Sequence, residues 1–141
     1  MERDCGAWIN MLSHKIKMRM NAALSDLGIT GVQSRIMHFI LVHCQDGTVF
    51  QKDVEDAFSL RRSTTTAILQ LMEKNCIIIR ESVPYDARLK SLVPTDKAAR
   101  LDEQVRTRIL EIDAMLTRDL SPGQQQLFME IAAQMARNLD S

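Results

Sequence analysis

The chain has 141 residues, 45% of them hydrophobic, and equal numbers of basic and acidic side chains, 18 of each. That length is typical of one domain that buries its core without disulfides or metals. No apolar run approaches the roughly 18–20 residues of a membrane span. The three cysteines are odd in number and widely spaced, which argues against a disulfide framework. We therefore expect a cytoplasmic protein with no membrane partner.

The N-terminal part predicts two helices joined at a glycine. Apolar residues recur at spacings of three and four over about 7–27, which marks one helical face. Gly28 ends this helix as a C′ glycine. Thr30 and Gln33 form a capping-box signal for a second helix. The apolar face of that helix comprises Val32, Ile36, Phe39 or Ile40, and Cys44.

A helix-turn-helix follows a turn at Asp46-Gly47 and a short β-like connector at 48–50. A short helix over 52–58 is linked tightly at Leu60 to a second one over 61–75. In the second helix the apolar residues are Ile68, Leu69, Leu71 and Met72. The polar residues expected on the opposite face are Arg62, Ser63, Thr65, Thr66 and Gln70. Small hydroxyl side chains suit a helix that lies close to a DNA surface.

Two strands over 77–82 and 89–93, separated by a turn with Pro84 and Asp86, predict a β-wing after this helix. Polar and apolar residues alternate along the second strand. Arg88 directly precedes this strand, and Lys90 lies in it. A recognition helix followed by a wing provides one element for each groove of duplex DNA.

The C-terminal part predicts two further amphipathic helices. Thr95 can cap a helix over about 96–118, and Ser121-Pro122-Gly123-Gln124 is a strong helix start. The last helix carries an apolar stripe of Leu127, Ile131, Met135 and Leu139. These stripes exceed what one small lobe can cover, so we expect them to be buried between two subunits.

The fold class expected is mostly α with a small β-wing, in the order α-α-β-α-α-β-β-α-α. The chain is expected to form a single domain over 1–141. Its winged helix-turn-helix lobe spans about 30–95, and its dimerisation helices span about 5–28 and 96–140. The distribution of charge agrees with DNA binding by the lobe, because residues 59–95 hold six basic and three acidic side chains. Local potential matters more for DNA binding than net charge.

This order of elements resembles the MarR family of bacterial winged-helix transcription regulators over nearly the whole chain, and the specific sequence matches lie between Ser63 and Thr95. The recognition-helix pattern matches at Ser63-Thr64-Thr65-Thr66-Ala67-Ile68 and at Met72-Glu73-Lys74-Asn75-Cys76-Ile77-Ile78-Ile79-Arg80. The wing pattern matches at Asp86-Ala87-Arg88-Leu89-Lys90-Ser91-Leu92-Val93-Pro94-Thr95. The chain departs from the family where Ala67 replaces an arginine, Cys76 a glycine and Pro94 a leucine. Phe50 replaces a helix-capping threonine.

The resemblance implies a homodimer that binds double-stranded DNA at a pseudo-palindromic operator, with repression as the expected effect. It also implies that Arg88 enters the minor groove and that Asp86 steadies the turn of the wing. The DNA-binding residues expected from helix, wing and resemblance together are Arg61, Arg62, Ser63, Thr65, Thr66, Gln70, Asp86, Arg88 and Lys90. Relatives often bind small aromatic or phenolic effectors between the DNA-binding lobe and the dimer helices. The nine methionines are either an adaptable lining of such a pocket or flexible filler of the core.

Several alternatives stay open. The zero net charge and Ala67 motivate a winged-helix module that pairs with protein and not with DNA. Cys5 is the candidate for an oxidant-sensing thiol, while Cys44 and Cys76 lie in apolar stretches and are expected in the core. His38 and His43 are too poorly spaced for a metal site. No catalytic or cofactor-binding motif is present, so we expect neither an enzyme nor a cofactor.

Overall fold

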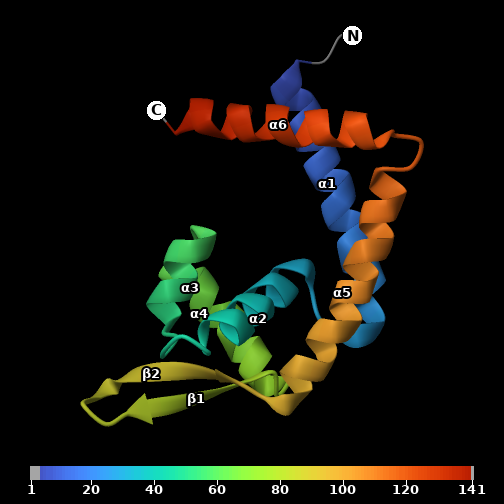
Figure 1. The fold of residues 1–141 in the computed structure, drawn as a ribbon. Coiled ribbons are helices and arrows are strands. Elements are labelled where there is room, and N and C mark those ends of the chain that lie inside the picture. The colour runs from blue at the N-terminus through green and yellow to red at the C-terminus, as the bar shows by residue number, and fades with distance from the viewer. Residues whose placement is uncertain (1–3, 141) are drawn as a thin grey trace. The chain divides into compact units, whose positions relative to one another are not determined.

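The computed structural model describes residues 4–140 as helices and one antiparallel hairpin (Figure 1). In chain order the elements are α1 (Cys5–Leu24), η1 (Ser25–Leu27), α2 (Gly31–His43), α3 (Gln51–Phe58), α4 (Arg62–Lys74), β1 (Ile78–Val83), β2 (Asp86–Pro94), α5 (Asp96–Leu116) and α6 (Pro122–Leu139). The order of elements predicted from the sequence is confirmed. The first wing strand has the expected length, and the second is longer than expected because it begins at Asp86. Among the described residues no helix is long and apolar enough to cross a membrane.

The chain divides into two compact units, Met1–Ile109 and Leu110–Ser141, with the boundary inside α5. The first unit contains the winged lobe, α1 and the N-terminal part of α5. The second contains the end of α5 and all of α6. The fold class predicted from the sequence, mostly helical with a small wing, is confirmed.

Helix ends are set by the residues that the sequence singled out. Gly28 follows η1 with a φ of 70°, a left-handed conformation that favours glycine. The capping box of α2 forms, because the Gln33 amide donates to Thr30 Oγ1 at 3.2 Å while the Gln33 side chain accepts from the Thr30 amide. Thr95 Oγ1 accepts from the Ala98 amide at 3.2 Å and so caps α5. These contacts satisfy amides that a helix start otherwise leaves unpaired.

The core of the first unit joins every element of the winged lobe to α5. Its fully buried side chains come from α2, α3, α4, the hairpin and α5, and include Ile36, Met37, Ile40, Val54, Leu69, Met72, Ile78, Leu92, Ala98 and Val105. Each large aliphatic side chain of this kind contributes about 1.5–3 kcal/mol when removed from water. The winged lobe therefore shares one core with α5 and, through Leu24, with the end of α1.

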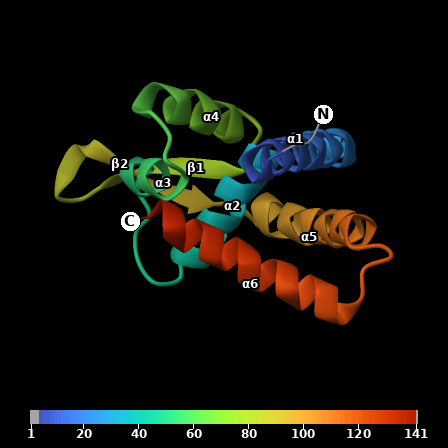
Figure 2. The same ribbon diagram turned by 90° about the horizontal axis from the view of Figure 1, so that it is seen from above.

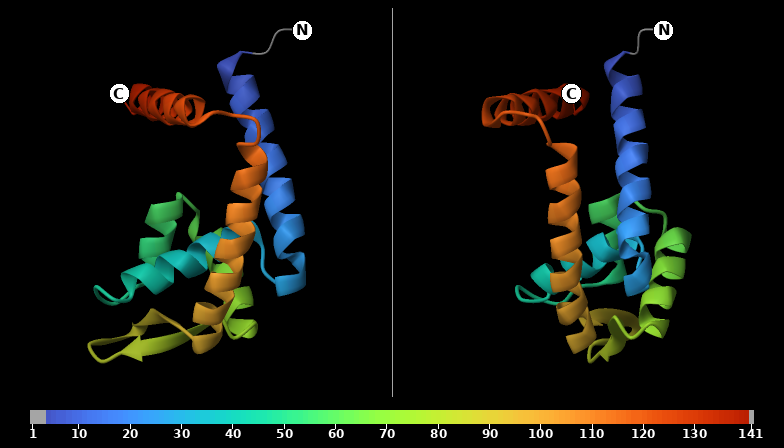
Figure 3. Two further views of the ribbon diagram at one scale, coloured as in Figure 1. Left: turned by 45° about the vertical axis from the view of Figure 1, so that its right-hand side comes forward. Right: turned by 90° about the vertical axis from the view of Figure 1, so that its right-hand side faces the viewer.

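The hairpin pairs β1 with β2 in antiparallel register from Ile78 opposite Pro94 to Val83 opposite Asp86, with an irregularity at Ser82/Val83. The β-like connector predicted at 48–50 is confirmed, since Phe50 bridges Ser91 and the Leu92 amide donates to the Val49 carbonyl at 2.8 Å. Figure 2 shows α3, α4 and the hairpin next to one another, and in Figure 3 (left) the hairpin projects from the base of the lobe. The projecting turn is thus free to reach a partner.

Arg108 ties α5 to the end of α1 within the first unit. Its guanidinium donates to both carboxylate oxygens of Asp26, at 2.8 and 2.9 Å, and to the backbone carbonyl of Ala23. The hydrogen bond from Arg108 lowers the pKa of Asp26 below its ordinary value. Leu24 is the fully buried residue of α1, Met20 packs against the core, and Ile9, Leu12 and Met18 are exposed.

Candidate nucleic-acid interface

Helices α3 and α4 form the helix-turn-helix. The N-terminus of α3 is capped from one side only, because Phe50 has no side-chain acceptor and its amide donates instead to Asp53 Oδ2 at 2.8 Å. The helix ends at Ser59, which adopts a left-handed conformation with φ 52°. The Leu60 amide then donates to the Glu55 carbonyl at 3.0 Å, which closes the tight link predicted from the sequence.

Two sequence-based assignments on α4 are wrong. Thr65 was expected to face DNA, but its side chain is fully buried and its hydroxyl donates to the Arg61 carbonyl at 2.9 Å. Leu71 was expected to face the core, but it is 52% exposed. The buried residues Thr65, Leu69 and Met72 follow the i, i+4, i+7 spacing of one helical face. That spacing was visible in the sequence and outweighs the polarity of a single threonine.

The outward face of α4 is mostly polar, and several of its side chains are small. The exposed residues of α4 are Arg62, Ser63, Thr64, Ala67, Gln70, Leu71, Glu73 and Lys74. Thr64 and Ala67 were not among the expected DNA contacts, although both lie on this face. Arg61 is exposed as well and stands at the N-cap position, without a side-chain capping bond. Small side chains at this face allow a close approach to another surface.

The tip of the wing is ordered by Asp86. One of its carboxylate oxygens accepts from the Arg88 amide at 2.9 Å and lies 3.3 Å from Arg88 Nε. The Arg88 side chain is 91% exposed, so it extends from the hairpin into solvent. Lys90 Nζ donates to Ser82 Oγ at 2.8 Å across the strands. The wing therefore presents two cations, each steadied by one neighbour.

A cleft of about 450 Å³ lies between α3, α4 and the wing, and we call it the wing cleft. Its ionisable lining residues are Lys52, Arg62, Arg80, Arg88, Lys90 and Glu55. Five are basic and one is acidic, and of the basic residues Lys52 and Arg88 pair with carboxylates outside the lining, so the lining is mainly basic in a chain of zero net charge. Local concentration of one charge sign in a cleft attracts anions.

The wing cleft brings together some of the expected site residues and leaves others apart. Arg62, Thr66, Arg88 and Lys90 line it, whereas Ser63 and Gln70 lie on the outward face of α4. The lining residues that the sequence did not predict include Gln51, Lys52 and Arg80. Arg80 ends the sequence pattern that resembles the family's recognition helix, but that pattern alone does not indicate a role for it at a cleft.

Gln51 connects the two helices at this cleft. Its side-chain amide donates to Thr66 Oγ1 at 2.8 Å and contacts the Arg62 carbonyl at 3.4 Å. Lys52 donates to Asp56 one turn along α3, and this hydrogen bond raises the pKa of the lysine. The Gln51 contacts therefore join α3 to α4 beside the wing, whereas the Lys52–Asp56 pair lies within α3.

Cys76 was expected in the core, and this is wrong. It is exposed and follows α4 with φ 61°, a conformation that favours glycine, the residue usual here in the family. Side chains at the start of α5 hydrogen-bond to the backbone of residues 75–76. Thr95 Oγ1 donates to the Cys76 carbonyl at 2.7 Å, and Lys97 Nζ donates to the Asn75 carbonyl at 2.8 Å. Cys44 is half-buried and packs against the core, as expected.

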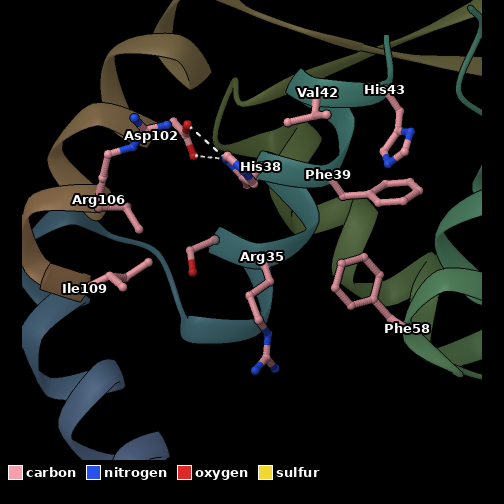
Figure 4. A pocket seen from close by; sticks show the side chains of 11 residues that line it. Arg35, His38, Phe39, Val42, His43, Phe58, Asp102, Arg106 and Ile109 are labelled. Atoms are coloured by element: carbon pink, nitrogen blue, oxygen red, sulfur yellow. Dashed lines mark hydrogen bonds and ion pairs between the residues drawn. The ribbon is translucent and has the colours of Figure 1, made fainter. Parts of the chain in front are cut away.

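A second cavity, of about 590 Å³, is lined by α2, α3 and α5, and we call it the α2–α5 pocket (Figure 4). Phe39, Val42, Phe58, Val105 and Ile109 give it apolar walls. His38 and Asp102 point toward one another across it, with His38 Nδ1 3.2 Å from both carboxylate oxygens. No methionine lines this pocket, so the expectation of a methionine lining is wrong for it. His38 and His43 both line it, and the described residues contain no cluster suited to a metal ion.

A helix-turn-helix followed by a two-stranded wing, with long helices before and after it in the sequence, defines a winged-helix fold. Comparison with solved structures shows which winged-helix proteins this chain is similar to. The chain is similar to the transcription regulator MarR from Oenococcus oeni, with 26% identity and a TM-score of 0.70 over 95% of this chain and 99% of that one. The resemblance to the MarR family predicted from the sequence is confirmed, and the chain has the MarR-type fold over nearly its whole length.

Two further structures show the same fold. MepR of Staphylococcus aureus, solved in complex with DNA, has 23% identity and a TM-score of 0.87 over 97% of this chain and 99% of that one. The reduced form of MarR from E. coli has 19% identity and a TM-score of 0.83 over 96% of this chain and 98% of that one. No protein-family model and no curated protein matches the sequence.

Proposed function

We propose that this protein is a DNA-binding transcription regulator that acts as a homodimer. One observation carries the proposal: the outward face of α4, the wing arginine and the positively lined wing cleft are contiguous parts of one lobe. The fold it shares with transcription regulators supports the same function, and the MepR structure was solved with DNA. Repression is the effect we propose for binding at an operator that overlaps a promoter.

Helix α4 is the proposed reader of the major groove. Arg61, Arg62, Ser63, Thr66 and Gln70 are its proposed DNA contacts, and Thr65 is not, because it is buried. Gln70 and Ser63 are exposed, whereas Thr66 already accepts a bond from Gln51 and is half-buried. Base-edge contacts specify sequence while phosphate contacts position the protein. Changing Gln70 is therefore expected to alter the preferred sequence in selection from a random pool.

The wing is the proposed minor-groove element. The Arg88 side chain is exposed and pairs with the Asp86 carboxylate, which also accepts from the Arg88 amide. Arginine in a narrow minor groove reads width and negative potential. Lys90, on the same strand, is the proposed phosphate contact. Removing its charge is expected to lower the affinity for all DNA sequences alike.

The helices at the two ends of the chain are proposed to dimerise it, over about 5–28 and 96–140, as parts of a single MarR-type domain. On α1, Trp8, Ile9 and Leu12 are exposed within one chain. On α6, Leu127, Phe128 and Ile131 are exposed as well. A symmetric dimer covers such faces and places two recognition helices about one helical turn of DNA apart.

The α2–α5 pocket is the proposed site for a small aromatic or phenolic effector. Its apolar walls suit a ring, and Arg35, Arg106 and His38 offer donors to an oxygen of the ligand. An effector that prefers one spacing of α2 against α5 lowers DNA affinity by differential binding. Filling the pocket with Val42→Trp is expected to abolish release by small phenols without changing DNA affinity.

The experiment that tests the proposed function is retention of the chain's own promoter fragment at physiological salt. Arg88→Ala should weaken binding by about 1–3 kcal/mol per contact, with an unchanged circular dichroism spectrum. Arg100→Ala serves as the matched control, because Arg100 is exposed on α5 and lies outside the wing cleft. Equal affinity of the two variants would show that the wing is not used.

The second candidate is a winged-helix module that binds protein. The zero net charge and Ala67 on the outward face of α4 favour it. Binding to mixed-sequence duplex separates the two functions, because phosphate contacts make affinity fall steeply with salt. Absence of any salt-dependent binding would favour the protein partner.

A further inference from the structure

Three side chains that carry methyl groups lie together on the outward face of α4. Thr64, Ala67 and Leu71 follow the i, i+3, i+7 spacing of one helical face, and all three are exposed. Leu71 is 52% exposed, whereas Leu69 on the opposite side of the helix is fully buried. We call these three residues the α4 methyl strip. Their apolar groups are left open to solvent within one chain.

Cations lie at both ends of the methyl strip. Arg62 is the first residue of α4 and Lys74 the last, and both are exposed. The acidic residue of the helix, Glu73, pairs with Arg80 of the neighbouring strand. Apolar groups between cations are complementary to a surface that is apolar in the middle and anionic at its edges. The major groove of DNA has this character, because phosphates line both rims and base edges form the floor.

The centre of this face has no side chain that reads guanine. Ala67 stands where the family that the sequence resembles has an arginine, and Ser63, one turn earlier, is also small. Arginine and lysine select guanine through its two major-groove acceptors. Alanine can make only van der Waals contacts, which require heavy atoms within about 4.0–4.5 Å. The apolar group that the floor of the major groove offers for such a contact is the 5-methyl group of thymine.

The polar residue beside the strip favours the same base pair. Gln70 is exposed and lies three residues after Ala67, so it is a neighbour of the strip on the helix surface. A glutamine amide pairs bidentately with N6 and N7 of adenine. Thr66 is half-buried and already accepts a hydrogen bond from Gln51 at 2.8 Å. The exposed amide next to the strip therefore selects an A·T pair, the pair that also provides the thymine methyl group.

We infer that the α4 methyl strip reads the 5-methyl group of thymine, so that each operator half-site has A·T pairs where the middle of α4 meets the major groove. The inference rests on the proposed function. It goes beyond that function because it gives base-reading roles to Ala67 and Leu71, which have no polar side-chain group, and specifies the bases that they select. 5-Methylcytosine carries the same methyl group, but its partner guanine calls for an arginine or lysine that the centre of this face lacks. Thymine is therefore the assigned occupant.

The test starts with selection of binding sites from a random duplex pool by the full chain. The inference predicts A·T pairs in the middle of each half-site. Each thymine of the selected duplex is then replaced in turn by deoxyuridine, which lacks the 5-methyl group and keeps every hydrogen-bonding group. Loss of one buried methyl group should lower affinity about fourfold, and symmetric replacement in both half-sites about fifteenfold. Thymines outside the half-sites serve as controls, and their replacement should leave the affinity unchanged.

Variants of the strip identify the side chains involved. Leu71→Ala should bind the thymine and deoxyuridine duplexes with nearly equal affinity, because the methyl group has lost its contact. Leu71→Gln keeps the length of the side chain and gives a second measurement should Leu71→Ala lose helix by circular dichroism. Ala67→Arg should change the preferred pair at this position from A·T to G·C in a repeated selection. Ile79→Ala is the control, because Ile79 is 49% exposed on β1 and lies outside α4, and it should keep the parent's loss on deoxyuridine replacement.

The outcomes separate the inference from the proposed function. If the parent selects a consensus sequence but deoxyuridine costs no affinity at any thymine, the inference is overturned and the function stands. The inference is also overturned if a sensitive thymine keeps its full effect in both Leu71 variants. If the parent retains no duplex at physiological salt, the proposed function is overturned and the inference with it.

Methylated cytosine is distinguished in the same series. Selected duplexes are prepared with 5-methylcytosine in place of each cytosine, and their affinities are compared with those of the unmethylated duplexes. The inference predicts no gain, because the strip is already opposite thymine. Tighter binding on cytosine methylation, with no loss on replacement of thymine by deoxyuridine, would overturn the assignment to thymine.

Discussion

The winged lobe and α6 have similar amphipathic sequences but differ in what covers their apolar faces. The lobe buries Ile36, Ile40 and Leu69 completely within one chain. Helix α6 begins at an equally well-formed capping box, Ser121 with Gln124, yet buries none of its 18 residues. The difference shows that local sequence signals are enough to specify a helix. Whether the apolar face of that helix is buried depends on whether the same chain provides a surface for it to pack against. We infer that the lobe is built to fold on its own contacts and α6 to be completed by a second copy.

The largest expected effect follows from charging the uncovered face of α6. Leu127→Lys combined with Ile131→Lys should abolish the proposed dimer, because each lysine would have to be buried without a partner. Gln126→Lys is the control, since Gln126 lies on the polar face and bonds Glu130. Sedimentation velocity measures the outcome. A double variant that sediments like the parent would show that α6 is not part of the interface.

The second prediction concerns two leucines of α4. Leu69→Ala should lower the free energy of unfolding by about 2–5 kcal/mol, because Leu69 is fully buried and leaves a cavity. Leu71→Ala, on the same helix but with 52% of the side chain exposed, should change it by less than about 0.5 kcal/mol. Urea denaturation of both variants measures the difference. Equal losses would contradict the assignment of the buried face.

The third prediction concerns Cys76 at the end of α4. Cys76→Gly should raise the free energy of unfolding by up to about 1 kcal/mol, since glycine adopts a positive φ without the steric cost of a Cβ. Cys44→Gly is the control, because Cys44 ends α2 with φ −64° and gains nothing from the exchange. Thermal unfolding compares the two. A Cys76→Gly variant less stable than the parent would show that no strain is relieved there.

The smallest expected effect is the pH dependence of the link between α1 and α5. Because Arg108 lowers the folded pKa of Asp26 below 3.8, the stabilisation is fully present above that unfolded value. It is lost as pH falls through the folded pKa. The stability difference between parent and Asp26→Asn should therefore be constant near neutral pH and vanish in acid. A difference that persisted unchanged below the folded pKa would point to another cause.

Sequence reasoning predicted the elements and most of their boundaries because helix caps and periodicity are local signals. It placed Thr65 wrongly because polarity was weighed above the spacing that Thr65 shares with Leu69. It missed the wing cleft because Gln51, Thr66 and Arg80 come from three different elements. Their proximity depends on how α3, α4 and β1 pack, which no local pattern records. Cys76 was misplaced because apolar neighbours in sequence do not determine the direction of a residue in a left-handed turn.

The most direct test of the central claim, that two winged lobes joined by the terminal helices act on one duplex, is the stoichiometry of binding. A fluorescent duplex selected from a random pool is titrated with the protein, and the mass of the complex is measured by sedimentation equilibrium. The account predicts two chains per duplex, with half-sites about one helical turn apart, and loss of this complex in the Leu127→Lys, Ile131→Lys variant. One chain per duplex, bound equally well by that variant, would contradict it.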